Sequence, residues 1–249
     1  VDVYDSTFNI DCEKLEIAIQ DTIKNGKLKP KAIIPVDLFG VPARYRLIQE
    51  IANTYNLRVI EDAAQSFGGS IGSKKVGTFG DIAATSFYPA KPLGCYGDGG
   101  AMLTNDDYLA EQCKAIRIHG TSLDKYNSEV IGLNGRLDSM QAAVLLEKLP
   151  IFDEELAMRN KVSSYYREYL NNAQCIPKNY HSAQALFSIT LDSHKKREEI
   201  LNKLKQNNIP NVIYYKYPIH LMKGFSYLRH KDGDFPISEN LSQTIVSLP

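Results

Sequence analysis

The sequence lacks several features that would place it in a specialised class. Its 249 residues include 29 basic and 29 acidic side chains, so no net charge is available to attract a nucleic-acid backbone or an anionic lipid surface. No stretch approaches the ~20 consecutive apolar residues of a membrane-spanning helix. The first residues, VDVYDSTFNID, have neither the basic region nor the apolar run of a signal peptide. With 43% hydrophobic residues, the composition is typical of a globular protein of one large or two modest domains.

Cysteine and histidine are few and scattered. The four cysteines form no CxxC pair and have no histidine at zinc-finger spacing (Cys12, Cys95, Cys113, Cys175). Such thiols predict a cytoplasmic protein without disulfides. We expect no metal site, because the histidines that we considered lie far apart without ligand spacing (His119, His194, His220, His230). The glycine-rich run 94–100 is not a GxGxxG motif between a strand and a helix, and no Walker lysine pattern exists, so no dinucleotide-binding fold is predicted.

Helical and extended patterns alternate along the first part of the chain. Apolar residues recur at helical spacing over 11–24, where Asp11 can serve as N-cap, and over 47–55. Apolar, β-branched runs suited to buried strands occupy 31–36 and 57–62. This strand–helix–strand order, with a crossover of helix length, predicts a parallel sheet.

The rest of the chain divides at Pro150. Before it we predict strands over 82–88 and 100–104 and helices over 106–118 and 138–149. After it we predict a long helix over 152–171, a strand over 185–191, a helix over 195–207 and a short final helix. The predicted fold class is therefore α/β, with a large domain over residues 1–150 and a smaller α+β domain over 151–249.

The first candidate functional residue ends a predicted strand. Asp62 closes the run 57–62 and is followed by Ala63, Ala64 and Gln65. Ligands of open parallel sheets bind beyond the carboxyl ends of the strands, and a carboxylate beside two small residues and an amide can face a flat ring. Helix capping by Asp62 is the alternative, and it would be the better interpretation if the motif stood alone.

The second candidate is a lysine in a rigid turn. Lys91 lies between Pro89 and Pro92 in SFYPAKPLG (residues 86–94). Most lysines on turns are solvated, but an apolar, glycine-bounded turn can hold an amine in a cleft. There, desolvation or a neighbouring cation would lower its pKa from ~10.4 and make it nucleophilic. An amine that forms Schiff bases, paired with a strand-end carboxylate, suggests pyridoxal phosphate chemistry.

The glycine-rich middle of the chain also resembles a known family. Residues 61–106 (EDAAQSFGG to MLTND) are similar to the DegT/DnrJ/StrS family of pyridoxal-phosphate-dependent nucleotide-sugar aminotransferases, which have fold type I. Asp-x-Ala-Gln and Ser-x-x-x-x-Lys occur together at the family's separation. The segments 32–40, 116–120 and 132–149 support the resemblance, which extends over nearly the whole chain. It implies a mostly parallel sheet flanked by helices and a smaller C-terminal α+β domain.

The resemblance implies a role for each candidate residue. Lys91 would hold pyridoxal 5'-phosphate as the internal aldimine and act as the catalytic residue, and Asp62 would pair with the pyridine nitrogen. Ala64 would pack against one face of the ring, Gln65 would contact the ring hydroxyl, and Ser86 would bind the phosphate.

Two further residues follow from the same resemblance. Asn134 matches a position that reaches the phosphate from the neighbouring subunit, which implies a homodimer with shared active sites. His220, in YPIHL, lies in a region where family members place substrate-facing residues.

The implied reaction is a transamination. An amino donor, usually glutamate in this family, leaves as 2-oxoglutarate, and a keto-sugar carried on a nucleotide diphosphate receives the amino group. Products of this kind serve surface polysaccharide or glycoconjugate biosynthesis. The segment 92–97 is slightly more similar to members that aminate C3 of the hexose than to those that act at C4.

Other functions remain open. A pyridoxal-phosphate-dependent sugar dehydratase shares the scaffold, but such relatives replace the Schiff-base lysine with histidine, so Lys91 disfavours it. Intact Asp62, Gln65 and Lys91 also disfavour a non-catalytic binding or regulatory member. The non-catalytic alternative is favoured by two segments that this sequence lacks. Family members have an earlier segment, which supplies phosphate-binding backbone amides and an aromatic ring that stacks on the cofactor. They also have a last C-terminal stretch, and nothing in this sequence corresponds to either segment. The resemblance therefore predicts a fragment of a longer chain. A generic α/β protein whose glycines only make turns is the remaining alternative.

Overall fold

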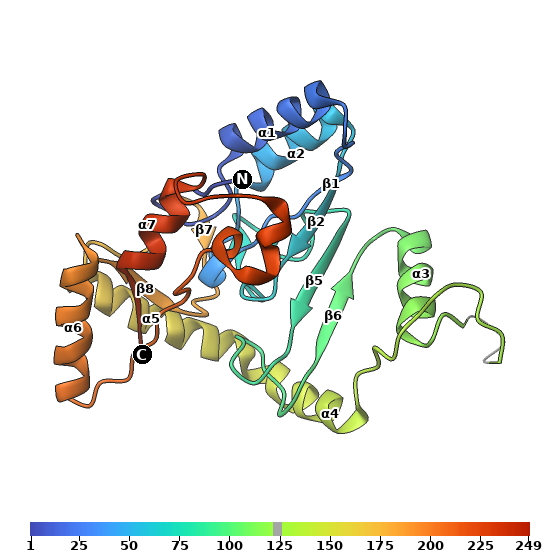
Figure 1. Cartoon of the computed structure of the whole chain (residues 1–249). Coiled ribbons are helices and arrows are strands. Elements are labelled where there is room, and N and C mark those ends of the chain that lie inside the picture. Colours follow the sequence, from blue (N-terminus) through green and yellow to red (C-terminus); the bar gives the residue numbers. More distant parts are fainter. Residues whose placement is uncertain (122–125) are drawn as a thin grey trace.

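A four-stranded sheet forms the centre of the first part of the chain (Figure 1). The computed structural model describes residues 1–121 and 126–249. The strand order is β1 (Ala32–Ile33), β2 (Arg58–Asp62), β5 (Ile82–Ser86) and β6 (Gly100–Leu103). The first three strands are parallel, and β6 runs antiparallel to β5. The prediction of a mostly parallel sheet is confirmed, with β6 as its antiparallel edge.

Two helices cover one face of this sheet, α1 (Cys12–Asn25) and α2 (Tyr45–Tyr55). The predicted N-cap is confirmed, because Asp11 Oδ1 accepts hydrogen bonds from the backbone N–H groups of Glu13 (2.9 Å) and Lys14 (3.2 Å). Apolar side chains of both helices pack on the strands to form a buried core, which includes Leu15, Ile19, Ile33, Ile48, Ile51 and Val59. This core holds β1 and β2 in register.

The opposite face of the sheet is open in the part of the chain that the structure describes. Ile34, Val36 and Met102, which lie in or just after the outer strands β1 and β6, are 58%, 39% and 48% exposed. Because side chains alternate between the two faces of a strand, this open face also carries every second residue of β2 and β5. Asp62 and Ala84, which are register partners, lie on it.

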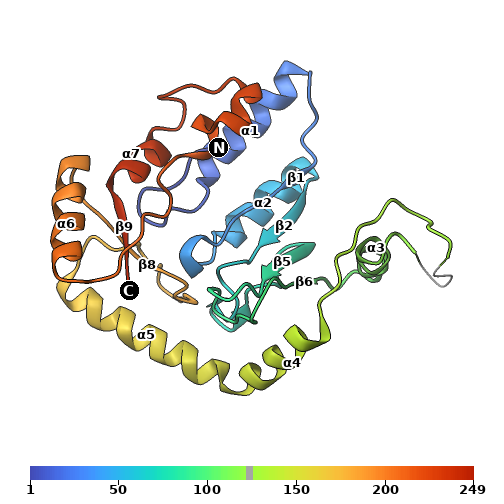
Figure 2. The same ribbon diagram turned by 60° about the horizontal axis from the view of Figure 1, so that its bottom comes forward.

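A curved run of helices follows the sheet. It consists of α3 (Asp107–Arg117), then α4 (Ser139–Lys148) and α5 (Phe152–Tyr169). Pro150 lies in a short 3-10 turn (Leu149–Ile151) that joins α4 to α5, and Figure 2 shows these two helices as one arc around the lower side of the molecule. The domain boundary at residue 150 stays a prediction.

The C-terminal part contains a second, two-stranded antiparallel sheet of β8 (Phe187–Thr190) and β9 (Ile245–Leu248). Two helices accompany it, α6 (His194–Gln206) and α7 (Pro236–Thr244), and 3-10 turns occupy Ile219–Leu221 and Lys223–Leu228. The sequence did not predict β9. It forms because its pairing with β8 buries Val246 completely and joins the hydroxyls of Ser188 and Ser247 at 2.7 Å.

A third sheet connects the two parts of the chain. Its strands are β3 (Ser70–Ile71), β4 (Lys74–Lys75) and β7 (Tyr180–His181), in the order β4-β3-β7. None of these two-residue strands was predicted. In the described ranges no helix is long and apolar enough to cross a membrane.

The carboxylate of Asp2 joins the start of the chain to α7, and we expect its removal to lower the free energy of unfolding. It is 3% exposed and accepts hydrogen bonds from the backbone N–H groups of Ile237 and Ser238 (both 3.0 Å) and from the Ser238 hydroxyl (2.7 Å). These bonds lower the pKa of Asp2 to about 2 although burial opposes them. A carboxyl group with a depressed folded pKa stabilises the protein above its unfolded pKa of 3.8, and that stabilisation is lost as the pH falls toward 2.

Asp2→Asn is therefore expected to lower the free energy of unfolding by roughly 1–2 kcal/mol at pH 7. Urea unfolding at several pH values measures this difference, which should shrink between pH 4 and pH 2. A difference that stays constant over that range would contradict the role of the charge.

Candidate active site

The sheet places Asp62 and Ser86 on the same face, at the carboxyl ends of two neighbouring strands. Asp62 ends β2 and is the register partner of Ala84 in the neighbouring parallel strand, so Ser86 lies two residues further along the same face. From strand spacing and rise, the Cα atoms of Asp62 and Ser86 are about 8 Å apart. Both residues are partly buried. A pyridine ring with a phosphate arm can span this separation.

Local hydrogen bonds orient both side chains. Asp62 Oδ1 accepts from the backbone N–H of Ala64 at 3.1 Å, as in an aspartate that caps the turn after its strand. Ser86 Oγ accepts from the backbone N–H of Tyr88 at 3.2 Å, which leaves its hydroxyl hydrogen available to donate. The capping alternative and the cofactor role of Asp62 are thus compatible, because a carboxylate can accept several hydrogen bonds.

Lys91 lies on the loop that follows β5, and this loop is anchored at several points. Leu93 and Cys95 are buried against α4 and α5, the Cys95 N–H donates to Phe87 O (2.7 Å), and Lys148 Nζ donates to Gly94 O (2.7 Å). The Lys91 side chain is partly buried. A well-held loop of this kind fixes where the base of the lysine side chain lies.

The turn after β2 carries Ala64 and Gln65. Ala64 is partly buried, beside the fully packed Ala63. Both ends of the Gln65 amide have partners: its Oε1 accepts from the backbone N–H of Phe39 (2.6 Å), and its Nε2 donates to the Tyr215 hydroxyl (3.1 Å). The Phe39 and Tyr215 rings are also stacked, with centroids 6.4 Å apart.

Asn134 and His220 each have a side-chain partner outside this set of residues. Asn134 is exposed between α3 and α4, where its side-chain oxygen accepts from Arg136 Nε at 3.1 Å, and α3 stands clear of the sheet in Figure 1. His220 is 9% exposed, and its Nε2 lies 2.8 Å from Glu239 Oε1. Its ring also packs edge-on against Phe235. Its substrate-facing role stays a prediction.

Two residues beside the site were not predicted from the sequence. One is Tyr215, the partner of Gln65. The other is Asp37, which is completely buried and accepts a hydrogen bond from Ser66 Oγ at 2.7 Å. A signal existed for Asp37, because it directly follows the predicted strand 31–36 and thus lies at the same sheet edge as Asp62. No local pattern marks Tyr215, which is 150 residues from Gln65.

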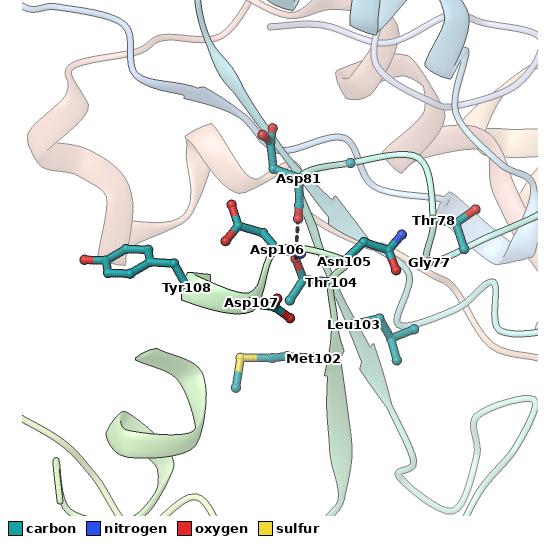
Figure 3. Close-up of a pocket in the computed structure, with 11 residues that line it drawn as sticks. Gly77, Thr78, Asp81, Met102, Leu103, Thr104, Asn105, Asp106, Asp107 and Tyr108 are labelled. Atoms are coloured by element: carbon teal, nitrogen blue, oxygen red, sulfur yellow. Dashed lines mark hydrogen bonds between the residues drawn. The ribbon is translucent and has the colours of Figure 1, made fainter. Parts of the chain in front are cut away.

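A pocket elsewhere on the molecule is not the candidate site. It is lined by residues at the opposite end of β5 and β6, among them Asp81, Thr104 and Tyr108 (Figure 3). Asp81 and Ser86 are separated by the length of β5, about 16 Å. Thr104 Oγ1 donates to Asp81 O at 2.7 Å, which ties β6 to the start of β5. Within the ranges 1–121 and 126–249, no group of three or more His, Cys, Asp or Glu residues could hold a metal ion.

The residues at the sheet edge fit pyridoxal phosphate in their chemistry. A carboxylate for the pyridine nitrogen comes from the end of β2, a hydroxyl for the phosphate from the end of β5, and a primary amine from the loop that follows β5. The small residues Ala64 and Ala84 leave space beside Asp62. These are the groups that the cofactor requires.

Comparison with solved structures defines the class of fold. The crystal structure of a DegT DnrJ EryC1 StrS aminotransferase from Brucella abortus is similar, with a TM-score of 0.94 and 46% identity; the match covers 100% of this chain and 67% of that one. NtdA from Bacillus subtilis, solved with bound cofactor PMP, matches with a TM-score of 0.86 and 28% identity over 100% of this chain and 57% of that chain. The fold is that of the pyridoxal-phosphate-dependent sugar aminotransferases.

The family assignment rests on the whole chain. The model of the DegT/DnrJ/EryC1/StrS aminotransferase family matches residues 1–249, and the protein belongs to this family. It is 41% identical to a pleiotropic regulatory protein of Geobacillus stearothermophilus and 39% identical to UDP-2-acetamido-2-deoxy-3-oxo-D-glucuronate aminotransferase of Pseudomonas aeruginosa. Both matches cover 100% of this chain, and 66% and 67% of those relatives. The chain thus spans about two thirds of the length of the curated relatives that it matches.

A substitution at Gly94 tests whether the close packing of the loop sets the position of Lys91. A Cβ atom added at Gly94 would lie 2.6 Å from Pro89 O and 2.8 Å from Tyr88 O, both backbone atoms, so Gly94→Ala must move the loop. We expect it to cost about 1–3 kcal/mol of stability and to weaken pyridoxal phosphate binding. Thermal unfolding and absorption titration measure these effects.

The matched control is Gly224→Ala, because no atom lies within 4 Å of a Cβ added there. This variant should behave as the wild type. Unchanged cofactor binding in Gly94→Ala would show that the loop does not set the position of Lys91.

Proposed function

We propose that this chain carries the catalytic centre of an aminotransferase that uses pyridoxal 5'-phosphate to convert a keto-sugar nucleotide into an amino-sugar nucleotide. The observation that carries the proposal is the sheet register, which puts Asp62 and Ser86 on one face at one edge, with Lys91 on the loop that follows. Membership of the family and the PMP bound to NtdA support it.

Each residue contributes a separate function at this centre. Bound pyridoxal phosphate supplies an electron sink for the pair of electrons released when a C–H bond next to nitrogen breaks. The Asp62 carboxylate would hold the proton on the pyridine nitrogen, and Ser86 would donate a hydrogen bond to the phosphate. Lys91 Nζ would hold the cofactor and, as a free amine, would take the proton from the α-carbon of the amino donor. Gln65 would contact the ring hydroxyl and Ala64 one face of the ring.

The substrates follow from the relatives. We infer glutamate as amino donor, as the resemblance to the family implies. We infer a nucleotide-linked 3-keto sugar as acceptor, because the aminotransferase from Pseudomonas aeruginosa is named for a 3-oxo sugar nucleotide. The product would serve surface polysaccharide or glycoconjugate biosynthesis in the cytoplasm, a compartment that agrees with four unpaired cysteines. We also propose a homodimer, in which the exposed Asn134 reaches the phosphate of the partner's site.

The test is glutamate-dependent formation of 2-oxoglutarate by the complete polypeptide with a panel of 3-keto and 4-keto nucleotide sugars. We expect turnover with 3-keto acceptors and less with 4-keto acceptors. Turnover with neither class would refute the substrate assignment, even if the cofactor binds.

A regulatory function is the second candidate, because the similar protein from Geobacillus stearothermophilus is called a pleiotropic regulatory protein. The same assay separates the two. A regulatory member that had lost catalysis would bind pyridoxal phosphate or a nucleotide sugar without forming 2-oxoglutarate. The dehydratase alternative remains disfavoured, because position 91 is a lysine.

A further inference from the structure

A buried carboxyl group lies beneath the candidate site, on the core side of the sheet. Asp37 follows β1 and is 0% exposed. Its Oδ1 accepts hydrogen bonds from the backbone N–H of Ala43 (2.7 Å) and from the Tyr45 hydroxyl (2.8 Å), and its Oδ2 accepts one from Ser66 Oγ (2.7 Å). One side chain therefore joins the end of β1, the start of α2 and the turn after β2.

Such a group is costly to bury. Burial raises the pKa of Asp37 to about 7, although hydrogen bonds from Ser66, Ala43 and Tyr45 oppose this change. An apolar side chain of similar size would avoid the cost of burying a carboxyl group, but it would leave the Ala43 N–H and the Tyr45 and Ser66 hydroxyls without this acceptor. What Asp37 adds over such a residue is the direction of its hydrogen bonds.

These hydrogen bonds continue into the candidate site. The backbone N–H of Asp37 donates to Asp62 O at 3.1 Å. Ser66, held by the Asp37 carboxyl group, closes the turn that carries Gln65. Two residues after Asp37, the Phe39 N–H donates to the Gln65 side chain at 2.6 Å. The segments 37–43 and 62–66 are thus joined at three points, and Asp37 takes part in two of them.

We propose that Asp37 is a positioning residue that fixes segment 62–66 against segment 37–43 and thereby directs the Asp62 carboxylate and the Gln65 amide toward the cofactor. Asp37 itself lies on the core side and acts through these residues. The inference rests on the proposed function, because that function assigns Asp62 and Gln65 to pyridoxal phosphate.

The test compares two substitutions at this position. Asp37→Ala removes every acceptor, whereas Asp37→Asn keeps the shape and one oxygen acceptor for Ala43 and Tyr45. We expect Asp37→Ala to speed amide hydrogen exchange over 37–43 and 62–66 in cofactor-free protein. We also expect it to weaken pyridoxal phosphate binding about tenfold or more and to shift the absorption band of the bound cofactor. Asp37→Asn should stay within about threefold of the wild type in both measurements.

The matched control is Asp2→Ala. Asp2 is also a buried aspartate that accepts hydrogen bonds from backbone N–H groups and a serine hydroxyl, but it joins the N-terminal segment to α7. The Asp2→Ala variant should be less stable than the wild type. At a temperature where this variant is folded, amide exchange over 62–66 and the affinity for pyridoxal phosphate should not change. If Asp37→Ala does not fold, Ser66→Ala tests the same link, because it removes only the partner of Oδ2.

The outcomes separate this inference from the proposed function. Wild-type exchange over 62–66 in Asp37→Ala, or an equal effect of Asp2→Ala on that segment and on affinity, overturns the inference. A complete wild-type polypeptide that does not bind pyridoxal phosphate overturns the proposed function instead. The exchange comparison needs no cofactor, so it still decides whether Asp37 fixes the segment.

Discussion

Replacing Lys91 with arginine is expected to abolish covalent attachment of pyridoxal phosphate and to lower the transamination rate by roughly 10³-fold or more. A guanidinium group keeps the positive charge, but it is always protonated and so provides neither a nucleophilic amine nor a base. Borohydride reduction followed by peptide mapping measures the attachment, and 2-oxoglutarate formation measures the rate. We expect label on residue 91 in the wild type and none in Lys91→Arg.

The matched control for this prediction is Lys148→Arg. Lys148 Nζ donates to Gly94 O at 2.7 Å, so it contacts the same loop, and an arginine can still donate there. This variant should keep the label and most of the activity. If Lys91→Arg retained the label, another lysine would be the attachment site, and the assignment would fail.

Asp62→Asn is expected to lower the transamination rate by about 100-fold or more. Asparagine is almost the same size and can still accept the hydrogen bond from the Ala64 N–H, so the turn after β2 should keep its shape. A neutral amide lacks the negative charge that keeps the pyridine nitrogen protonated, and without that proton the ring withdraws electrons much less strongly. Steady-state rates and the absorption spectrum of the bound cofactor check this prediction.

Asp106→Asn is the matched control, because Asp106 caps α3 by accepting from the Leu109 N–H at 3.1 Å, and asparagine is an equally good N-cap. It lies near the opposite end of β5 and β6, so activity should not change. An Asp62→Asn enzyme with activity within about threefold of the wild type would rule out the charge pairing.

Several elements could be predicted from local sequence alone. The helix capped by Asp11 and the strand that ends at Asp62 have the predicted positions, because periodicity and capping depend on residues only a few positions apart. The predicted strand 31–36 is shorter in the structure, where only Ala32–Ile33 forms regular pairs and Val36 makes an isolated bridge to Asp62. Pro35 explains the interruption, since proline cannot donate a hydrogen bond to the sheet.

Contacts between distant segments were not predictable in this way. Strand β9 requires β8, almost 60 residues earlier in the chain, as its partner, and β7 requires β3. The network around Asp37 likewise joins residues that no spacing rule connects, because Ser66 is 29 positions away.

By itself the sequence determined the alternation of strands and helices, the charge balance and the pairing of Asp62 with Lys91 in a recognisable motif. Only the tertiary structure decided which faces these residues share, which groups orient Gln65, and that a buried carboxyl group lies beneath the site. Motifs depend on neighbours along the chain, whereas burial and hydrogen-bond partners depend on segments that folding brings together.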